Sequence, residues 1–282
     1  MDILSLLMVF LVIVAIIWMK KPLFLAMAGG IVAAVLLFGI SPGEAVRILG
    51  RQTVAWDTID VLLSFYLIIF LQLMLEKKGR LENARKSFHC LLRNRRMNTI
   101  VSPAIMGLLP SAAVMTICAD MVDKSCEDYL DARDKTFVAC YYRHIPEMFL
   151  PTFPAVLLGL TLSGQNAGMF VICMIPMVIA ACAIVNVTHL RKLPKTMPPL
   201  VQTADKKAEI LSLLRNLWTL IAVLLIIILF NLSVCVAAPL VIAANYVWDR
   251  FRLRDLPELL LPSAEPVLLG NMYLLMLFKG IL

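Results

Sequence analysis

Apolar stretches recur along the whole chain, and short polar or basic segments separate them. A helix that crosses a membrane needs about 20 predominantly apolar residues. We predict eight spans, at residues 3–19, 23–40, 59–75, 137–162, 169–190, 217–231, 233–248 and 265–282, with three prolines interrupting the fourth. Segment 41–57 is polar and begins with Ser-Pro-Gly-Glu, which is typical of a capped helix start. The pattern predicts an all-α integral membrane protein.

One apolar stretch, residues 99–119, is interrupted near its middle by Pro103, Gly107 and Pro110. A proline inside a helix removes a backbone hydrogen bond and clashes with the preceding turn. We therefore expect two short helices that meet near Pro110 as a re-entrant hairpin, with a single Pro-kinked span as the alternative. Broken helices are tolerated at membrane depth where they are buried in protein or line a water-filled cavity. They form the substrate sites of many secondary transporters.

Composition also indicates a membrane protein. Hydrophobic residues make up 61% and charged residues 16%, with a mean hydropathy of +0.88, whereas a soluble protein is nearer half apolar and a quarter charged. The net charge of +7 does not indicate a nucleic-acid partner, because the 26 Lys and Arg lie mostly between the spans. If the N-terminus is outside, the positive-inside rule is satisfied, because these basic segments then lie in the cytoplasm: 20–21, 76–98, 121–135, 191–215 and 250–254.

The order of elements repeats along the chain. Spans one to three include the amphipathic segment 41–57, and spans six to eight include a similar segment at 250–262. The two sets enter the membrane from opposite faces, and inverted repeats of this kind build many secondary transporters. We predict an incomplete inverted repeat with three parts: a first repeat at 1–190, a cytoplasmic basic linker at 191–215 and a partial second repeat at 216–282, without a second hairpin.

Two motifs carry a resemblance to a known family: M-G-L-L-P at 106–110 and Y-Y-R-H-I-P-E-M-F-L-P-T-F-P at 141–154. The chain resembles the uncharacterised membrane family called domain of unknown function 401, which is placed in the ion transporter superfamily. The resemblance implies a multi-pass protein of the bacterial inner membrane that transports anions or organic acids. Family members tend to carry a Pro-Gly-Gly-type hairpin tip and to be longer, whereas Ser111-Ala112-Ala113 follow Pro110 here. These departures point to a degenerate, split or partner-dependent protein.

Ionisable residues inside spans are functional candidates because they are costly there. Arg143, His144 and Glu147 lie near the inner edge of the fourth span. We expect Arg143 to neutralise an anionic substrate, and His144 with Glu147 to relay a proton. An interfacial ion pair is the structural alternative. Asp60, at the outer mouth of the third span, is a further ion-coupling candidate or simply part of a helix start.

The predicted hairpin offers hydroxyl groups and helix ends. If its second helix begins near Ser111, the positive helix end can bind an anion, although Ser111 is also a natural cap. We predict these hairpin residues as substrate contacts: Ser102, Gly107, Pro110, Ser111 and Thr116.

Motifs for metal or nucleotide chemistry do not stand out. The seven cysteines form no C-x-x-C pair and the three histidines are scattered. We therefore expect no metal, no cofactor and no enzyme activity. The leading hypothesis is a secondary transporter that moves a small anionic solute coupled to H⁺ or Na⁺, either as a homo-oligomer or with a companion membrane subunit. The alternative is a non-transporting or partner-dependent membrane subunit, such as half of a split transporter or a scaffold.

Overall fold

The computed structural model describes residues 3–91, 94–108, 113–126, 129–194, 206–230 and 232–282. In these residues it contains helices and no β-strand, which confirms the all-α prediction. The chain divides into two compact units. The first unit comprises Met1–Leu67 with Leu260–Leu282, and the second comprises Ile68–Leu259.

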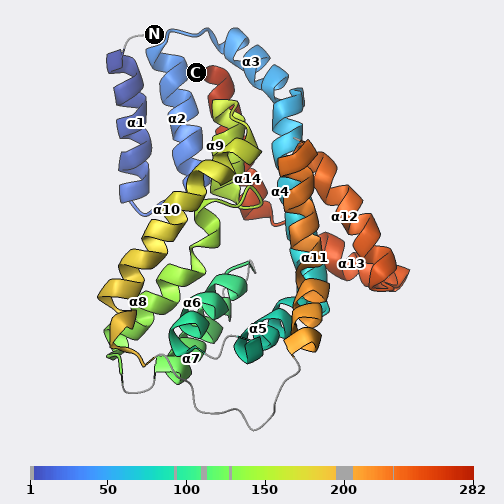
Figure 1. Cartoon of the computed structure of the whole chain (residues 1–282). Coiled ribbons are helices and arrows are strands. Elements are labelled where there is room, and N and C mark those ends of the chain that lie inside the picture. The colour runs from blue at the N-terminus through green and yellow to red at the C-terminus, as the bar shows by residue number, and fades with distance from the viewer. Residues whose placement is uncertain (1–2, 92–93, 109–112, 127–128, 195–205, 231) are drawn as a thin grey trace. The chain divides into compact units, whose positions relative to one another are not determined.

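The first unit is built from apolar helices that pack in pairs. Its helices are α1 (Ile3–Trp18), α2 (Leu23–Leu37), α3 (Pro42–Val54), the first half of α4 (Trp56–Lys77) and α14 (Pro266–Ile281). Helix α2 packs against both α1 and α14 (Figure 1). Their shared core is apolar and includes Val9, Ile13, Ala26, Ala34 and Leu277.

Ser41 caps α3, because its Oγ accepts a hydrogen bond from the Glu44 N–H at 3.3 Å. The same serine stands in Gly39-Ile40-Ser41-Pro42-Gly43, which has the G-x-S-x-G spacing of a hydrolase nucleophile elbow. Such an elbow needs a strand before the serine, whereas α2 precedes this one. We therefore interpret Ser41 as a helix cap.

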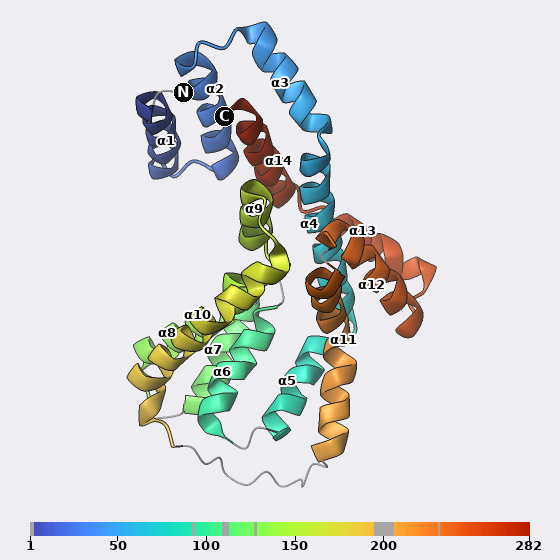
Figure 2. The same ribbon diagram turned by 45° about the horizontal axis from the view of Figure 1, so that its top comes forward.

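The second unit contains the predicted hairpin and its surroundings. Its helices are α5 (Arg80–Leu91), α6 (Arg95–Met106), α7 (Ala113–Cys126), α8 (Ala132–Arg143), α9 (Pro154–Ser163), α10 (Ala167–Thr188), α11 (Lys206–Phe230) and α12 (Val234–Trp248), with the second half of α4 and half of α13 (Leu256–Ser263). Figures 1 and 2 show α6, α7 and α8 side by side. Their core includes Met106, Val114, Cys118, Val138 and Tyr142.

Three helices are long and apolar enough to cross a membrane, namely α4, α10 and α11. A fourth is added if α13 and α14, which are bent by 45°, count as one span. The prediction of eight spans is not confirmed, because α1, α2, α9 and α12 are shorter apolar helices. At 1.5 Å per residue, a helix of about 15 residues covers roughly 23 Å of a hydrocarbon core about 30 Å thick. The predicted inverted repeat and the division at 190 and 215 stay predictions.

Three segments differ from expectation. Segment 76–98 is not only a loop, because α5 occupies its middle and buries Leu81, Ala84 and Ser87 at a helical spacing of three residues. Helix α11 begins at Lys206, so its first residues belong to the segment 191–215 that is predicted as a basic linker. The predicted fourth span is two separate helices, α8 and α9, with a 3₁₀ turn at Pro146–Met148 between them.

Candidate functional site

Two short helices stand where the sequence predicts a hairpin. Helix α6 begins after Asn94, whose side-chain oxygen accepts hydrogen bonds from the backbone N–H groups of Arg96 (3.0 Å) and Met97 (3.4 Å). Helix α6 packs against α7, which resumes at Ala113. The predicted tip residues Pro110 and Ser111 lie outside the described residues. The interruption of the apolar stretch is therefore observed, whereas its re-entrant course through a membrane stays a prediction.

The hairpin and the broken fourth span touch at Gly107. A methyl group at Gly107 would collide with the carbonyl oxygen of Arg143 and lie 3.0 Å from its carbonyl carbon. Only a residue without a side chain permits this approach between the end of α6 and the end of α8. The structure thus brings together two of the predicted site residues, which are far apart in the sequence.

Arg143 lies half-buried at the end of α8. Its Nε atom is buried and has no hydrogen-bond partner among the described residues. Within that part of the chain Arg143 also forms no ion pair with a carboxylate. A buried donor on a charged group is costly when it is unpaired, so this guanidinium is suited to donate hydrogen bonds to an anionic group.

His144 and Glu147 follow Arg143 in the turn between α8 and α9. His144 Nδ1 lies 2.8 Å from Glu147 Oε2, and both side chains are more than a third exposed. An imidazole and a carboxylate at this distance can share a proton. The geometry fits the predicted pair, and its role in ion coupling stays a prediction.

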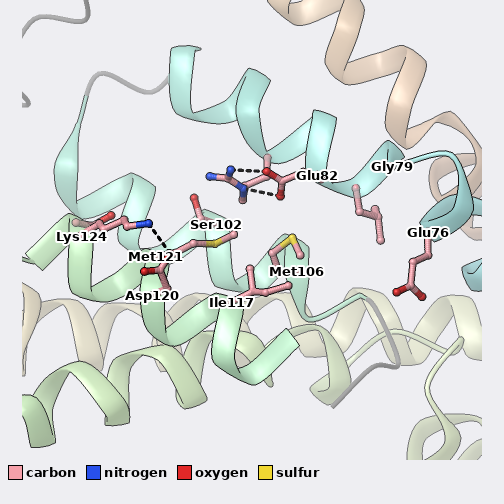
Figure 3. Close-up of a pocket in the computed structure, with 12 residues that line it drawn as sticks. Glu76, Gly79, Glu82, Ser102, Met106, Ile117, Asp120, Met121 and Lys124 are labelled. Carbon is pink, nitrogen blue, oxygen red and sulfur yellow. Dashed lines mark hydrogen bonds and ion pairs between the residues drawn. The ribbon is translucent and has the colours of Figure 1, made fainter. Parts of the chain in front are cut away.

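A cavity of about 560 Å³ lies on the side of the hairpin that faces α5 (Figure 3). Its wall is formed by residues of α4, α5, α6 and α7, among them Glu76, Glu82, Ser102, Asp120 and Lys124. Ser102 is only 6% exposed, and its hydroxyl makes no hydrogen bond to another described residue. It is therefore available to a molecule in the cavity.

Charges of both signs line this cavity. Arg85 Nε donates to Glu82 Oε2 at 2.9 Å, and Lys124 Nζ lies 2.7 Å from Asp120 Oδ2 (Figure 3). Glu76 has no ion-pair partner within the described segments. The charges on the wall nearly cancel, and apolar side chains such as Met106, Ile117 and Met121 line the rest of the cavity.

The hydrogen bond from Arg85 holds the pKa of the Glu82 carboxyl below its ordinary value of 4.5. A lowered pKa means that the pair stabilises the fold above that ordinary value and that this contribution is lost as the pH falls below it. We expect Glu82→Gln to flatten the loss of stability below about pH 4.5. Thermal unfolding of the detergent-solubilised protein, measured from pH 3 to pH 7, checks this. The exposed Glu44, changed to Gln, serves as control, and an equal effect of both substitutions would contradict the assignment.

The remaining predicted residues lie elsewhere. Thr116 is exposed on α7 and does not line the cavity. Asp60 belongs to the first unit, whereas the other predicted residues that the structure describes belong to the second. The structure therefore does not bring Thr116 to the cavity, and the role of Asp60 stays a prediction.

The sequence interpretation missed the contribution of α5 to the site. The charge pattern predicts only that Glu82 and Arg85 lie in a basic cytoplasmic segment, 76–98. The pattern that could have identified them is the spacing of Leu81, Ala84 and Ser87, which are buried on one face of the helix. Glu82 and Arg85 directly follow two of these residues, so they lie beside the buried face and near the helices that pack on it.

Comparison with known protein families settles the relationship. The family model described as "Protein of unknown function (DUF401)" matches residues 3–282. The chain belongs to this family. The predicted resemblance to DUF401 is thereby confirmed, and the match spans almost all of this chain. A search of curated proteins found no match. Among the described residues of this DUF401 protein, no group of three or more His, Cys, Asp or Glu is placed to hold a metal ion.

Proposed function

We propose that this DUF401 protein is a secondary-transporter-like membrane protein of the ion transporter superfamily type, which moves a small anionic solute coupled to H⁺ or Na⁺. The observation that carries the proposal is the contact between two broken helical segments, at Gly107 and Arg143. Broken segments in an apolar chain leave helix ends and backbone groups for a solute, which is how many transporters build their sites.

Arg143 is the residue that makes the proposed site prefer an anionic solute. Its Nε is buried without a partner in the described part of the chain, and its backbone carbonyl meets the end of α6 at Gly107. A solute carboxylate or phosphate would satisfy this donor, and Arg favours such groups because its guanidinium can bind two of their oxygens at once. Hairpin residues complete the proposed solute site: Ser102, Gly107, Pro110 and Ser111, whereas Thr116 lies outside the cavity lining.

Two residues of the second unit and one of the first supply the proposed ion coupling. His144 and Glu147, 2.8 Å apart, exchange the coupling proton, and Asp60 takes part in ion coupling from the first unit. The cavity beside α5 is the aqueous approach to the hairpin. The protein lies in the bacterial inner membrane as a multi-pass protein with its N-terminus outside, as the positive-inside rule favours, and works as a homo-oligomer or with a companion subunit.

Replacing Arg143 by Gln is expected to reduce solute uptake about tenfold or more, because one charged hydrogen bond contributes about 1.5–3 kcal/mol. Uptake is measured in proteoliposomes under an imposed pH or Na⁺ gradient, with a panel of acetate, citrate, phosphate and chloride. Arg143→Lys retains the positive charge but cannot form a bidentate pair of hydrogen bonds with the solute. This variant is expected to keep part of the uptake.

The matched control is Arg133→Gln, since Arg133 lies on the same helix and is exposed. Equal uptake by Arg143→Gln and Arg133→Gln in folded protein would contradict the role of Arg143. A wild-type chain that transports nothing alone, but transports when reconstituted with a co-purified membrane chain, would instead support the partner-dependent subunit.

A further inference from the structure

A second cavity in the second unit, of about 630 Å³, lies where α5 meets α11 and the end of α12. A buried ion pair forms its base. Arg80 is only 5% exposed, and its Nε donates to Asp249 Oδ2 at 2.8 Å while its Nη2 donates to Asp249 Oδ1. Arg80 Nη1 also donates to the carbonyl oxygen of Arg215. These bonds satisfy both oxygens of Asp249 and hold three helices at fixed positions around the cavity.

The rest of the lining is rich in positive charge. Lys78, Lys86 and Arg215 are exposed on it, with Glu209 as the remaining carboxylate once Asp249 is paired with Arg80. Lys86 and Arg215 form no ion pair within the described residues. Two unneutralised cations that line the same cavity attract an anion more strongly than one isolated surface charge does.

Neutral hydrogen-bonding groups stand beside these cations. Ser87 Oγ lies 2.9 Å from Ser212 Oγ, and Asn216 Nδ2 donates to the Ser212 carbonyl oxygen at 2.8 Å. Hydroxyl, amide, ammonium and guanidinium groups together are the donors that bind phosphate oxygens. The cavity is thus lined for an oxyanion.

The cavity lies beside a boundary between apolar and polar helical segments. Helix α4 turns polar at Glu76, α12 ends at Trp248, and the long apolar run of α11 begins at Leu217, so three helices change from apolar to polar beside it. Trp218 and Trp248 lie together at this boundary, with ring centroids 6.0 Å apart. Tryptophan side chains are enriched at the headgroup level of membranes.

We propose that this cavity binds a phosphate group, carried by the headgroup of an anionic lipid. The positive charges of Lys86 and Arg215 attract the phosphate, and the serine and asparagine side chains orient its oxygens. The Arg80–Asp249 ion pair holds α5 and the end of α12 in position around the cavity. This site is separate from the hairpin cavity and does not depend on transport by this protein.

The test uses Trp218 and Trp248 as reporters. The full-length chain with Trp18→Phe and Trp56→Phe is placed in phosphatidylcholine nanodiscs and titrated with short-chain phosphatidylglycerol. A saturable change in tryptophan emission is expected. The double variant Lys86→Gln/Arg215→Gln is expected to weaken binding about 25-fold, since each basic residue near an anionic lipid surface contributes about a fivefold factor.

The matched control removes two positive charges elsewhere, with Arg191→Gln/Lys192→Gln, and is expected to change the affinity less than twofold. Inorganic phosphate, titrated in parallel, distinguishes the sources. Much weaker binding of phosphate assigns the site to a lipid, and equal binding assigns it to a free phosphate compound. An unsaturable signal, or equal losses in both double variants, would overturn the proposal.

Discussion

Replacing Gly107 by alanine is expected to destabilise the protein by about 3 kcal/mol, at the upper end of the usual cost of overpacking. The added methyl group would collide with the Arg143 carbonyl oxygen and lie 3.0 Å and 3.2 Å from its carbonyl carbon and Cα. These are backbone atoms, which cannot rotate away as the end of a side chain can. Relief requires the end of α6 to move from α8, and this movement also disturbs the proposed solute site.

The measurement is unfolding of the detergent-solubilised protein by denaturant or heat, together with uptake by the refolded variant. Gly159→Ala is the matched control. Gly159 lies within α9 and has open space around it, so alanine there is expected to be neutral or to stabilise by up to about 1 kcal/mol through helix propensity. Equal stability of Gly107→Ala and the wild-type protein would show that α6 does not rest on α8 as described.

Replacing Asp249 by alanine is expected to destabilise the second unit by about 3–5 kcal/mol, which is the cost of leaving one member of a buried ion pair without its partner. The Arg80 side chain is 6% exposed and that of Asp249 is 11% exposed. The substitution removes two of the three hydrogen bonds that Arg80 makes. Unfolding curves of the purified variant check the expected loss.

Two further variants separate the buried charge from a general effect of charge removal. Lys124→Ala breaks an ion pair whose side chains are 74% and 59% exposed, and is expected to cost at most about 1 kcal/mol. Arg80→Met with Asp249→Leu removes both buried charges and is expected to recover part of the stability lost in Asp249→Ala. No recovery in the double variant would mean that the pair acts through its hydrogen bond to Arg215 rather than through charge.

The order of the apolar stretches determined where most helices lie. The predicted spans at 3–19, 23–40, 169–190 and 233–248 correspond to α1, α2, α10 and α12 within a few residues. This succeeded because helix formation depends on local properties, namely the length of an apolar run and the proline or polar residues that end it. The interrupted stretch around Gly107 was recognisable as two helices for the same reason.

The candidate site could be predicted only in part. Arg143 and Gly107 stood out because a charge and a small residue inside apolar stretches need an explanation. Their contact, however, joins residues far apart along the chain, and no local pattern specifies such a contact. The cavity beside α5 was missed for the same reason, since its walls come from four helices.

The sequence by itself thus determined the all-helical class, the membrane character and the family. The tertiary structure alone decided that segment 76–98 contains a packed helix, that Gly107 touches Arg143, and that Arg80 pairs with Asp249, 169 residues away. The physical reason is the range of the forces. Helix propensity and hydropathy act over one or two turns, whereas cavities and buried ion pairs arise from packing between segments that are distant in the chain.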